Sequence, residues 1–218
     1  PYGMEKLEER IHRQGGKTIA YGTTTATRYV DSDFDDAIDK IVGFFQSSGH
    51  GDFRSFVLHS EASGTRLKAF RKALPELSTT ELETKHLRYF EMPDTWSFAP
   101  EALFKIGYEK TEKLLAEEPG IQAIFYYSDF FALGGAHALA RRGYRIGEDI
   151  LIAGLNNIMA VRSSLVPISS ISHDSETICN TIYDALIHDR ECGKYVPAIP
   201  YLRSIEDFTR EFIPMNQK

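Results

Sequence analysis

The feature that most constrains the fold of this chain is a regular alternation between short apolar runs and longer amphipathic stretches. Runs such as SFVLH at 55–59 and QAIFYY at 122–127 have the length and composition of buried strands. The stretch 35–47 repeats apolar residues at helical spacing and ends before Gly49. Strands that alternate with helices form βα units. The pattern therefore predicts an α/β fold built on a parallel sheet with helices on both faces.

The same alternation extends over most of the chain, without an internal repeat or a low-complexity segment. We expect helices at residues 4–14, 35–47, 65–74, 101–117, 130–142 and 175–187. We expect strands at 18–22, 28–30, 55–59, 87–91, 122–127, 150–155 and 169–172, followed by extended segments.

Charge and cysteine content exclude several classes of function. The net charge is −6 and the Lys and Arg residues are scattered, whereas contact with nucleic-acid phosphates needs clustered positive charge. No apolar stretch approaches the roughly 20 residues that cross a membrane. Cys179 and Cys192 lack metal-like or C-x-x-C spacing, so we expect free thiols in a reducing compartment.

Short polar side chains follow three of the apolar strands. They are Ser60-Glu61, Ser128-Asp129 and Asn156-Asn157. Parallel sheets bind ligands beyond the carboxyl ends of their strands, although short polar residues also cap helices and turns. We expect Asp129 to cap the following helix. Ser128 and Asn156, at the ends of strands, are candidates for ligand contact, and Asn157 suits a turn.

Motifs that would indicate an enzyme are weak in this sequence. It lacks the nucleophile-elbow, P-loop, zinc-protease and dinucleotide-binding patterns. The acidic run DSDFDD, at 31–36, is more typical of a helix start than of an acid/base pair. His173 is the one histidine that follows a strand and could reach the same edge as Asn156. We expect a binding protein with no catalytic residue, no metal and no cofactor.

The stretch AIFYYSDFFALGGAHALARRGYRIGEDILIAGLNNI, residues 123–158, resembles the LacI/GalR family of bacterial transcription regulators. In that family a strand ends in Asn-Asp, a helix carries Ala-x-Gly, and a string G-x-R-V-P-E-D-V-S-V-V-G-F-D-D follows. Here these pieces are Ser128-Asp129, Ala132-Leu133-Gly134 and 143–157. Supporting segments occur in the family's order, namely FFQSSGH at 44–50, GTRLKAFRKAL at 64–74 and LVPISSISHD at 165–174.

The resemblance implies a periplasmic-binding-protein-like type I core, with parallel doubly wound sheets in two lobes. By this analogy residues 1–33 and 174–192 are a remnant of an incomplete N-terminal lobe. Residues 34–173 and 193–218 form the C-terminal lobe of the effector-binding core. The DNA-binding headpiece and about two βα repeats of the N-terminal lobe are expected to be absent from this chain.

Ligand-binding positions of the family can be transferred one at a time. The family's ligand-gripping arginine falls on Arg66, although an arginine at a helix surface is the alternative. The Asn of Asn-Asp falls on Ser128, the acidic residue of Gly-Phe-Asp on Asn156, and a Gln on His173. Because an amide donates as well as accepts, these departures leave a sugar, a sugar derivative and a nucleoside open as ligand.

Two further family features have looser matches. An aromatic that often covers the ligand corresponds to Trp96 or Phe98, for which core packing is the alternative. Asp129 occupies the Asp of the family's Asn-Asp pair and is included among the candidate ligand-binding residues.

The resemblance therefore implies the effector-binding and dimerisation core of a cytoplasmic, homodimeric LacI-type repressor, with no membrane partner. A small polar effector would bind between the lobes and bias their closure, and the missing headpiece would bind operator DNA. A solute-binding protein of a sugar transporter shares the fold, and an enzyme on a doubly wound sheet is a weaker alternative. A helix-turn-helix upstream of Pro1 would favour the regulator, and a signal peptide would favour the transporter.

Overall fold

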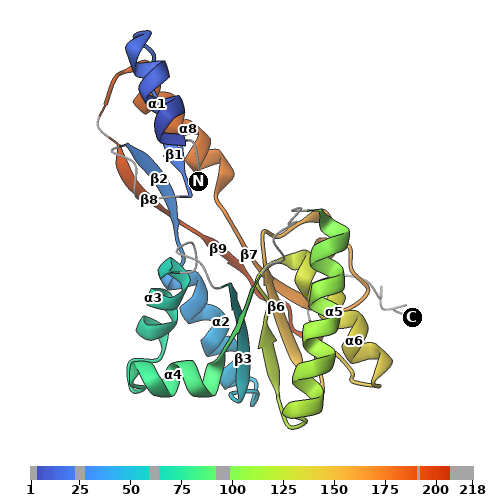
Figure 1. The fold of residues 1–218 in the computed structure, drawn as a ribbon. Helices are drawn as coiled ribbons and strands as arrows, with labels where there is room; N and C mark the ends of the chain where they lie inside the picture. Colours follow the sequence, from blue (N-terminus) through green and yellow to red (C-terminus); the bar gives the residue numbers. More distant parts are fainter. Residues whose placement is uncertain (1–3, 23–27, 59–63, 92–98, 191, 207–218) are drawn as a thin grey trace, which may run out of the picture. The chain divides into compact units, whose positions relative to one another are not determined.

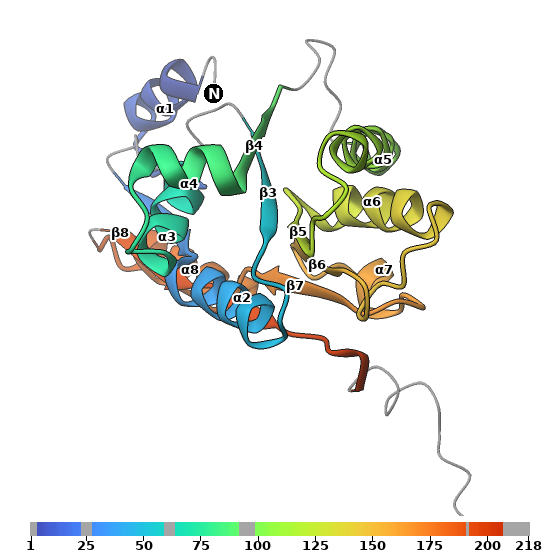
Figure 2. The same cartoon turned by 90° about the horizontal axis from the view of Figure 1, so that it is seen from below.

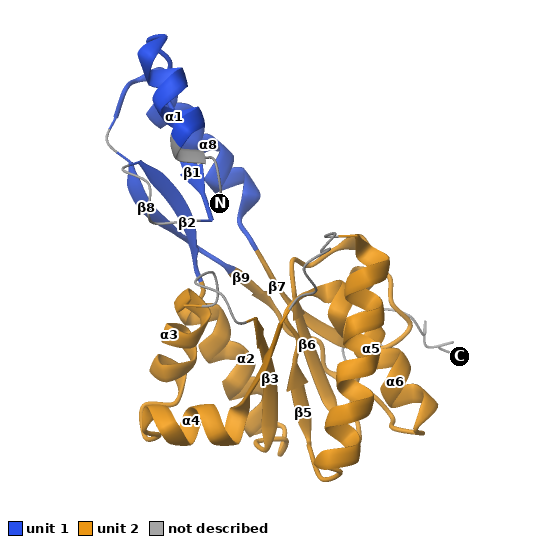
Figure 3. Cartoon of the chain, viewed as in Figure 1, with its two compact units in different colours: residues 1–33, 173–198 blue, residues 34–172, 199–218 orange. Residues whose placement is uncertain are grey.

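The computed structural model describes residues 4–22, 28–58, 64–91, 99–190 and 192–206. The chain divides into two compact units (Figure 3). The smaller unit comprises residues 1–33 and 173–198, and the larger unit comprises residues 34–172 and 199–218.

Two parts of the predicted division differ from these units. His173 and residues 193–198 are predicted to belong with the larger unit, but both belong to the smaller one. Strand β8 (Gly193–Pro197) pairs in parallel with β2 (Tyr29–Asp33) of the smaller unit.

The larger unit is built on a six-stranded sheet in the order β4-β3-β5-β6-β7-β9 (Figure 1). Five strands run parallel, and β9 is antiparallel to β7. The strands are β3 (Phe53–Leu58), β4 (Leu87–Phe90), β5 (Ala123–Phe125), β6 (Leu151–Leu155), β7 (Ile168–Ser172) and β9 (Ile199–Tyr201). The predicted parallel, doubly wound sheet is therefore confirmed.

Helices cover both faces of this sheet (Figure 2). One face carries α2 (Asp35–Ser47), α3 (Gly64–Ala73) and α4 (Thr79–His86). The other carries α5 (Pro100–Glu117) and α6 (Asp129–Arg141), and the short α7 (Met159–Arg162) follows β6. The acidic run begins a helix as predicted, since Asp35 and Asp36 lie in the first turn of α2.

Aromatic residues fill the core on both sides of the sheet. On the α2–α3 side, Phe53 stacks near Phe70, with ring centroids 6.2 Å apart, and Phe70 meets Phe125 edge-on at 5.6 Å. On the α5–α6 side, Phe56 lies 5.2 Å from Phe131 and 5.7 Å from Tyr126. Successive strand residues thus supply both cores, which explains why the strands are almost continuously apolar.

The smaller unit has a three-stranded parallel sheet in the order β1-β2-β8, where β1 is Ala20–Tyr21. Helices α1 (Met4–Arg13) and α8 (Ser175–Ile187) accompany it. Its core cluster is small and consists of Val30, Ile178, Ala185, Cys192 and Val196.

Helices α4 and α7 were not predicted from the sequence. Strands β8 and β9 lie where extended segments were expected, toward the end of the chain. Cys179 is exposed, Cys192 is buried, and both are free thiols, as predicted. No helix among the described residues is long and apolar enough to cross a membrane.

Candidate functional site

The candidate site lies at the carboxyl edge of the larger sheet, where the direction of winding reverses. From β3 the chain moves outward to β4, then crosses back to β5 on the other side of β3. Helices α3 and α6, which follow the adjacent strands β3 and β5, therefore lie on opposite faces of the sheet. Such a switch point is where open parallel sheets bind ligands. Helix α3 follows β3, and Ser128 and α6 follow β5.

Arg66, in the first turn of α3, lies at this switch point. Its Nη1 donates to the carbonyl oxygen of Tyr127 at 3.1 Å, and its Cζ lies 4.5 Å from the centre of the Tyr127 ring. The ring of Phe34 is 5.9 Å from the same carbon. Burial lowers the pKa of Arg66, while the contacts with Tyr127 raise it, and guanidinium stays charged in proteins. Among the described residues no carboxylate forms an ion pair with Arg66.

Ser128 connects β5 to α6 and caps the helix. Its backbone is extended (φ −152°, ψ 168°), its side chain is only 4% exposed, and its Oγ accepts from the N–H of Phe131 at 3.3 Å. The prediction that Asp129 is the cap was wrong by one residue, because Asp129 already belongs to the helix. The Ser128 hydroxyl, which accepts this hydrogen bond, can also donate one.

Asn156 and Asn157 form a turn with unusual backbone geometry directly after β6. Their φ angles are +107° and +47°, in the region that L side chains rarely adopt. The N–H of Asn156 donates to the carbonyl of Ile171 at 2.7 Å. The Asn156 side chain is exposed and, within the described part of the chain, makes no hydrogen bond. Backbone strain of this kind concentrates at functional sites.

Asp129 lies beneath this turn. It is 0% exposed, Oδ1 accepts from the hydroxyl of Ser170 at 2.7 Å, and Oδ2 accepts from the N–H of Ile158 at 2.8 Å. Burial raises the pKa of the Asp129 carboxyl. The hydrogen bonds from Ser170 and Ile158, together with the nearby backbone N–H of Asn157, oppose that rise. The carboxylate faces donors within the protein.

His173 belongs to the smaller unit. Its Nδ1 lies 2.6 Å from Ser32 Oγ and 3.0 Å from the hydroxyl oxygen of Tyr21, and the rings of Tyr21 and His173 meet edge-on. Tyr21 and Ser32 come from β1 and β2. His173 is thus part of a polar cluster at the strand ends of the smaller sheet.

The structure thus brings Arg66, Ser128, Asp129 and Asn156 to one edge of one sheet. Trp96 and Phe98 lie outside the described residues, as do Ser60 and Glu61. Sequence reasoning missed Tyr127, Phe34 and Ser170. Tyr127 could have been suspected from its place between a strand and the candidate Ser128, but no pattern indicated the other two.

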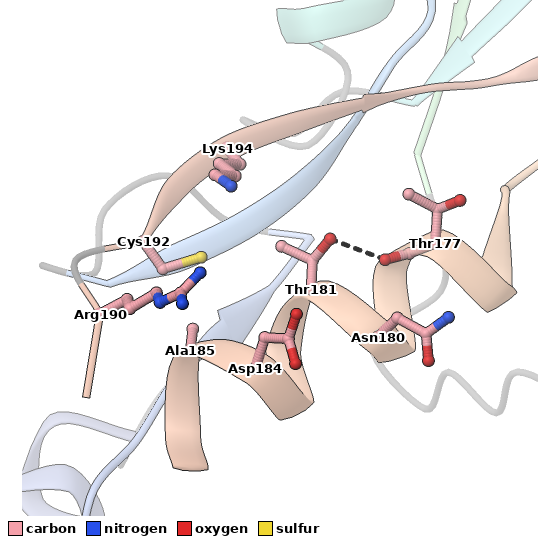
Figure 4. A pocket seen from close by; sticks show the side chains of 8 residues that line it. All are labelled: Thr177, Asn180, Thr181, Asp184, Ala185, Arg190, Cys192 and Lys194. Carbon is pink, nitrogen blue, oxygen red and sulfur yellow. Dashed lines mark hydrogen bonds between the residues drawn. The ribbon is translucent and has the colours of Figure 1, made fainter. Parts of the chain in front are cut away.

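A pocket of about 220 Å³ lies in the smaller unit, between α8 and the start of β8 (Figure 4). Its walls include Thr181, Asp184, Arg190, Cys192 and Lys194. The described residues that line it include none of those predicted from the sequence to bind a ligand. A group of three or more His, Cys, Asp or Glu side chains able to hold a metal is not found among the described residues.

Residues 42–195 match the family model of the periplasmic binding protein-like domain. This match covers more than half of the chain, so the chain belongs to this family, and its doubly wound sheet agrees with that assignment.

Among relatives, the HTH-type transcriptional repressor PurR of Edwardsiella ictaluri is 28% identical over 173 residues, which are 75% of this chain and 47% of the repressor. The chain spans about half the length of the curated relatives it matches. These relatives confirm the predicted resemblance to the LacI/GalR regulators.

Solved structures of LacI-family regulators share the fold. A sugar-binding transcriptional regulator from Escherichia coli, complexed with phosphate, aligns with a TM-score of 0.68 and 18% identity over 93% of this chain and 72% of its own. A regulator from Arthrobacter sp. FB24, complexed with lactose, aligns with a TM-score of 0.64 and 19% identity over 85% and 70% of the two chains.

Proposed function

We propose that this chain is the effector-binding and dimerisation core of a cytoplasmic LacI-type transcriptional regulator and not an enzyme. Its relatives are transcriptional repressors and regulators, some of them solved with sugars or phosphate. Effector binding biases the conformational equilibrium of the regulator and thereby its affinity for operator DNA. Operator contact is assigned to a headpiece outside residues 1–218, since this chain is acidic with a net charge of −6.

The observation that carries this proposal is Arg66 at the switch point. One N–H of the Arg66 guanidinium donates to the Tyr127 carbonyl, and the ring of Tyr127 packs against the guanidinium. The remaining donors suit hydroxyl, phosphate or carboxylate oxygens, which a planar guanidinium binds in pairs. Asn156 adds an exposed amide that both donates and accepts. The effector class is therefore a small polar molecule: a sugar, a sugar derivative or a nucleoside.

A thermal-shift panel of glucose, lactose, glucose 6-phosphate and adenosine tests the proposal. We expect at least one compound to raise the Tm, and Arg66→Ala to weaken its binding about tenfold or more, because a charged hydrogen-bond donor is lost. Arg66→Lys should recover little, since an ammonium lacks the planar fork.

Arg71→Ala is the matched control. Arg71 lies on the same helix and is half-exposed, 3.9 Å from Glu83, so its removal should leave binding unchanged. Binding that is equally strong in Arg66→Ala and wild type would contradict the proposed site. Turnover of the bound compound would contradict the assignment as a regulator.

A further inference from the structure

The turn at Asn156-Asn157 is an unusual way to end a strand. Two successive residues other than glycine have positive φ, which is unfavourable for L side chains and persists only where the surroundings enforce it. A glycine at either position would relieve the strain. The structure therefore has to supply contacts that hold this turn.

Those contacts form a short chain of hydrogen bonds from the Asn156-Asn157 turn, through Ser170, to the buried carboxylate of Asp129, and we call this chain the relay. The N–H of Asn157 donates to Ser170 Oγ at 3.0 Å, and the Ser170 hydroxyl donates to Asp129 Oδ1 at 2.7 Å. The N–H of Ile158 donates to Asp129 Oδ2 at 2.8 Å. The N–H groups of two consecutive residues are thus bound to one carboxylate, one through a hydroxyl and one directly.

The relay is closed to ligands. Asp129 is 0% exposed and Ser170 is 1% exposed. Gly154 makes room for the carboxylate, since a Cβ on that residue would lie 2.3 Å from Asp129 Oδ1. Three elements, α6, β6 and β7, therefore converge on a group that an effector does not touch. What is exposed above the relay is the side chain of Asn156.

We propose that Asp129 and Ser170 are positioning residues that hold the Asn156-Asn157 turn in its left-handed form and so fix the direction of the Asn156 amide toward the effector. This inference rests on the proposed function, because Asn156 is taken to contact the effector. It changes the role of Asp129 from ligand contact to support of a ligand contact, and it adds Ser170, which no sequence pattern indicated.

The test separates positioning from general stability by comparing neighbouring serines of β7. Ser170→Ala breaks the relay, whereas Ser170→Thr keeps the hydroxyl. Ser169→Ala is the control, because Ser169 is also 1% exposed but accepts from the N–H of Arg203 instead.

In the unliganded chain we expect Ser170→Ala to shift the amide resonances of Asn157 and Ile158 and to speed their hydrogen exchange. Ser169→Ala should leave both unchanged.

Affinity for whichever of glucose, lactose, glucose 6-phosphate or adenosine binds wild type gives the second measurement. We expect Ser170→Ala to weaken binding about tenfold, the effect of one lost hydrogen bond, while Ser170→Thr restores it. In an Asn156→Ala background Ser170→Ala should have no further effect on affinity. Asp129→Asn, which replaces one acceptor with a donor, should act like Ser170→Ala in both measurements.

Two results would overturn the inference. One is unchanged Asn157 and Ile158 resonances in Ser170→Ala; the other is an equal loss of affinity in Ser170→Ala and Ser169→Ala. Failure of the proposed function would give a different result: Asn156→Ala and Arg66→Ala would bind the probe as wild type does, or no probe would bind. In either case the resonances and exchange rates of Asn157 and Ile158 still decide whether Ser170 and Asp129 hold the turn.

Discussion

Glu118, at the end of α5, shows how one carboxylate joins three elements of the larger unit. Its Oε2 accepts from Arg54 on β3 at 2.6 Å and from Arg88 on β4 at 2.7 Å, and its Oε1 accepts from Arg88 Nε at 2.6 Å. Two guanidinium groups around one carboxylate form strong, charge-assisted hydrogen bonds. The hydrogen bonds from Arg88 and then Arg54 lower the pKa of Glu118, against the effect of its partial burial.

A lowered pKa makes this interaction dependent on pH. The stabilisation is fully present above the ordinary pKa of a glutamate and is lost as the pH falls through the lowered value. With the Glu118 side chain 24% exposed, we expect Glu118→Gln to cost about 1–2 kcal/mol at pH 7. The difference from wild type should shrink in strongly acidic solution. Urea unfolding of both proteins at several pH values measures it.

The control for this prediction is Glu112→Gln. Glu112 also pairs with an arginine, Arg142, at 2.8 Å, but this pair joins two helices at the surface and is more exposed. Its loss should therefore matter less. Equal losses in the two variants, or a Glu118→Gln effect that does not change with pH, would contradict the prediction.

The sequence predicted the position of some candidate site residues but not the residues that contact them. Arg66 and Asn156 were placed by family position, and both lie at the predicted sheet edge. The partners Phe34 and Ser170 were not predicted, because they approach from elements distant in sequence. The N-cap was predicted one residue too late, at Asp129 in place of Ser128. Both residue types are good N-caps, so the sequence does not distinguish the two positions.

Among the elements, α5 and α6 show why glycine is required inside a helix. A Cβ at Gly134 would lie 2.0 Å from the carbonyl oxygen of Phe104, and one at Gly107 would lie 2.1 Å from that of Phe131. The two helices therefore pack backbone to backbone. Gly134 belongs to the Ala132-Leu133-Gly134 motif, so that motif has a packing role that is independent of the ligand.

Adding a methyl group at this crossing should destabilise the larger unit. We expect Gly134→Ala to cost about 3 kcal/mol, because backbone atoms cannot move aside as a side chain can. Gly43→Ala, in helix α2, is the control: its Cβ would meet nothing within 4 Å, so it should be neutral or stabilise the helix by up to about 1 kcal/mol. Thermal unfolding of the two variants checks this, and similar Tm values would contradict it.

Helix α4 shows where periodicity fails as a signal. Only Leu82 is buried among its residues, so no apolar stripe exists to be recognised. The structure instead begins the helix with a capping box, in which Ser78 accepts from the N–H of Glu81 and Glu81 accepts from Ser78. That Ser-x-x-Glu pattern is present in the sequence. The capping pattern could therefore have predicted the helix where hydrophobicity could not.

At the scale of the whole molecule, the two units have cores of very different size. The smaller unit relies on the cluster around Val30 and Val196, while the larger has a core on each face of a six-stranded sheet. The strand-helix alternation predicted the class of both units. It could not assign β8, because the three edge-strand residues that begin it are exposed and show no alternation. The pairing of β8 with β2 depends on tertiary contacts, which the local sequence pattern does not show.

This difference in core size predicts unequal stability. A small unit buries less of its surface, so local opening should release it before the larger unit unfolds. We expect amides of β2 and β8 to exchange faster than those of β5 and β6. Val30→Ala, at a position 0% exposed, should lower the protection of the smaller unit by about 2 kcal/mol and leave β5 and β6 nearly unchanged. Native-state hydrogen exchange measures both. A uniform loss of protection in β2, β8, β5 and β6 would instead mean that the chain unfolds as one cooperative body.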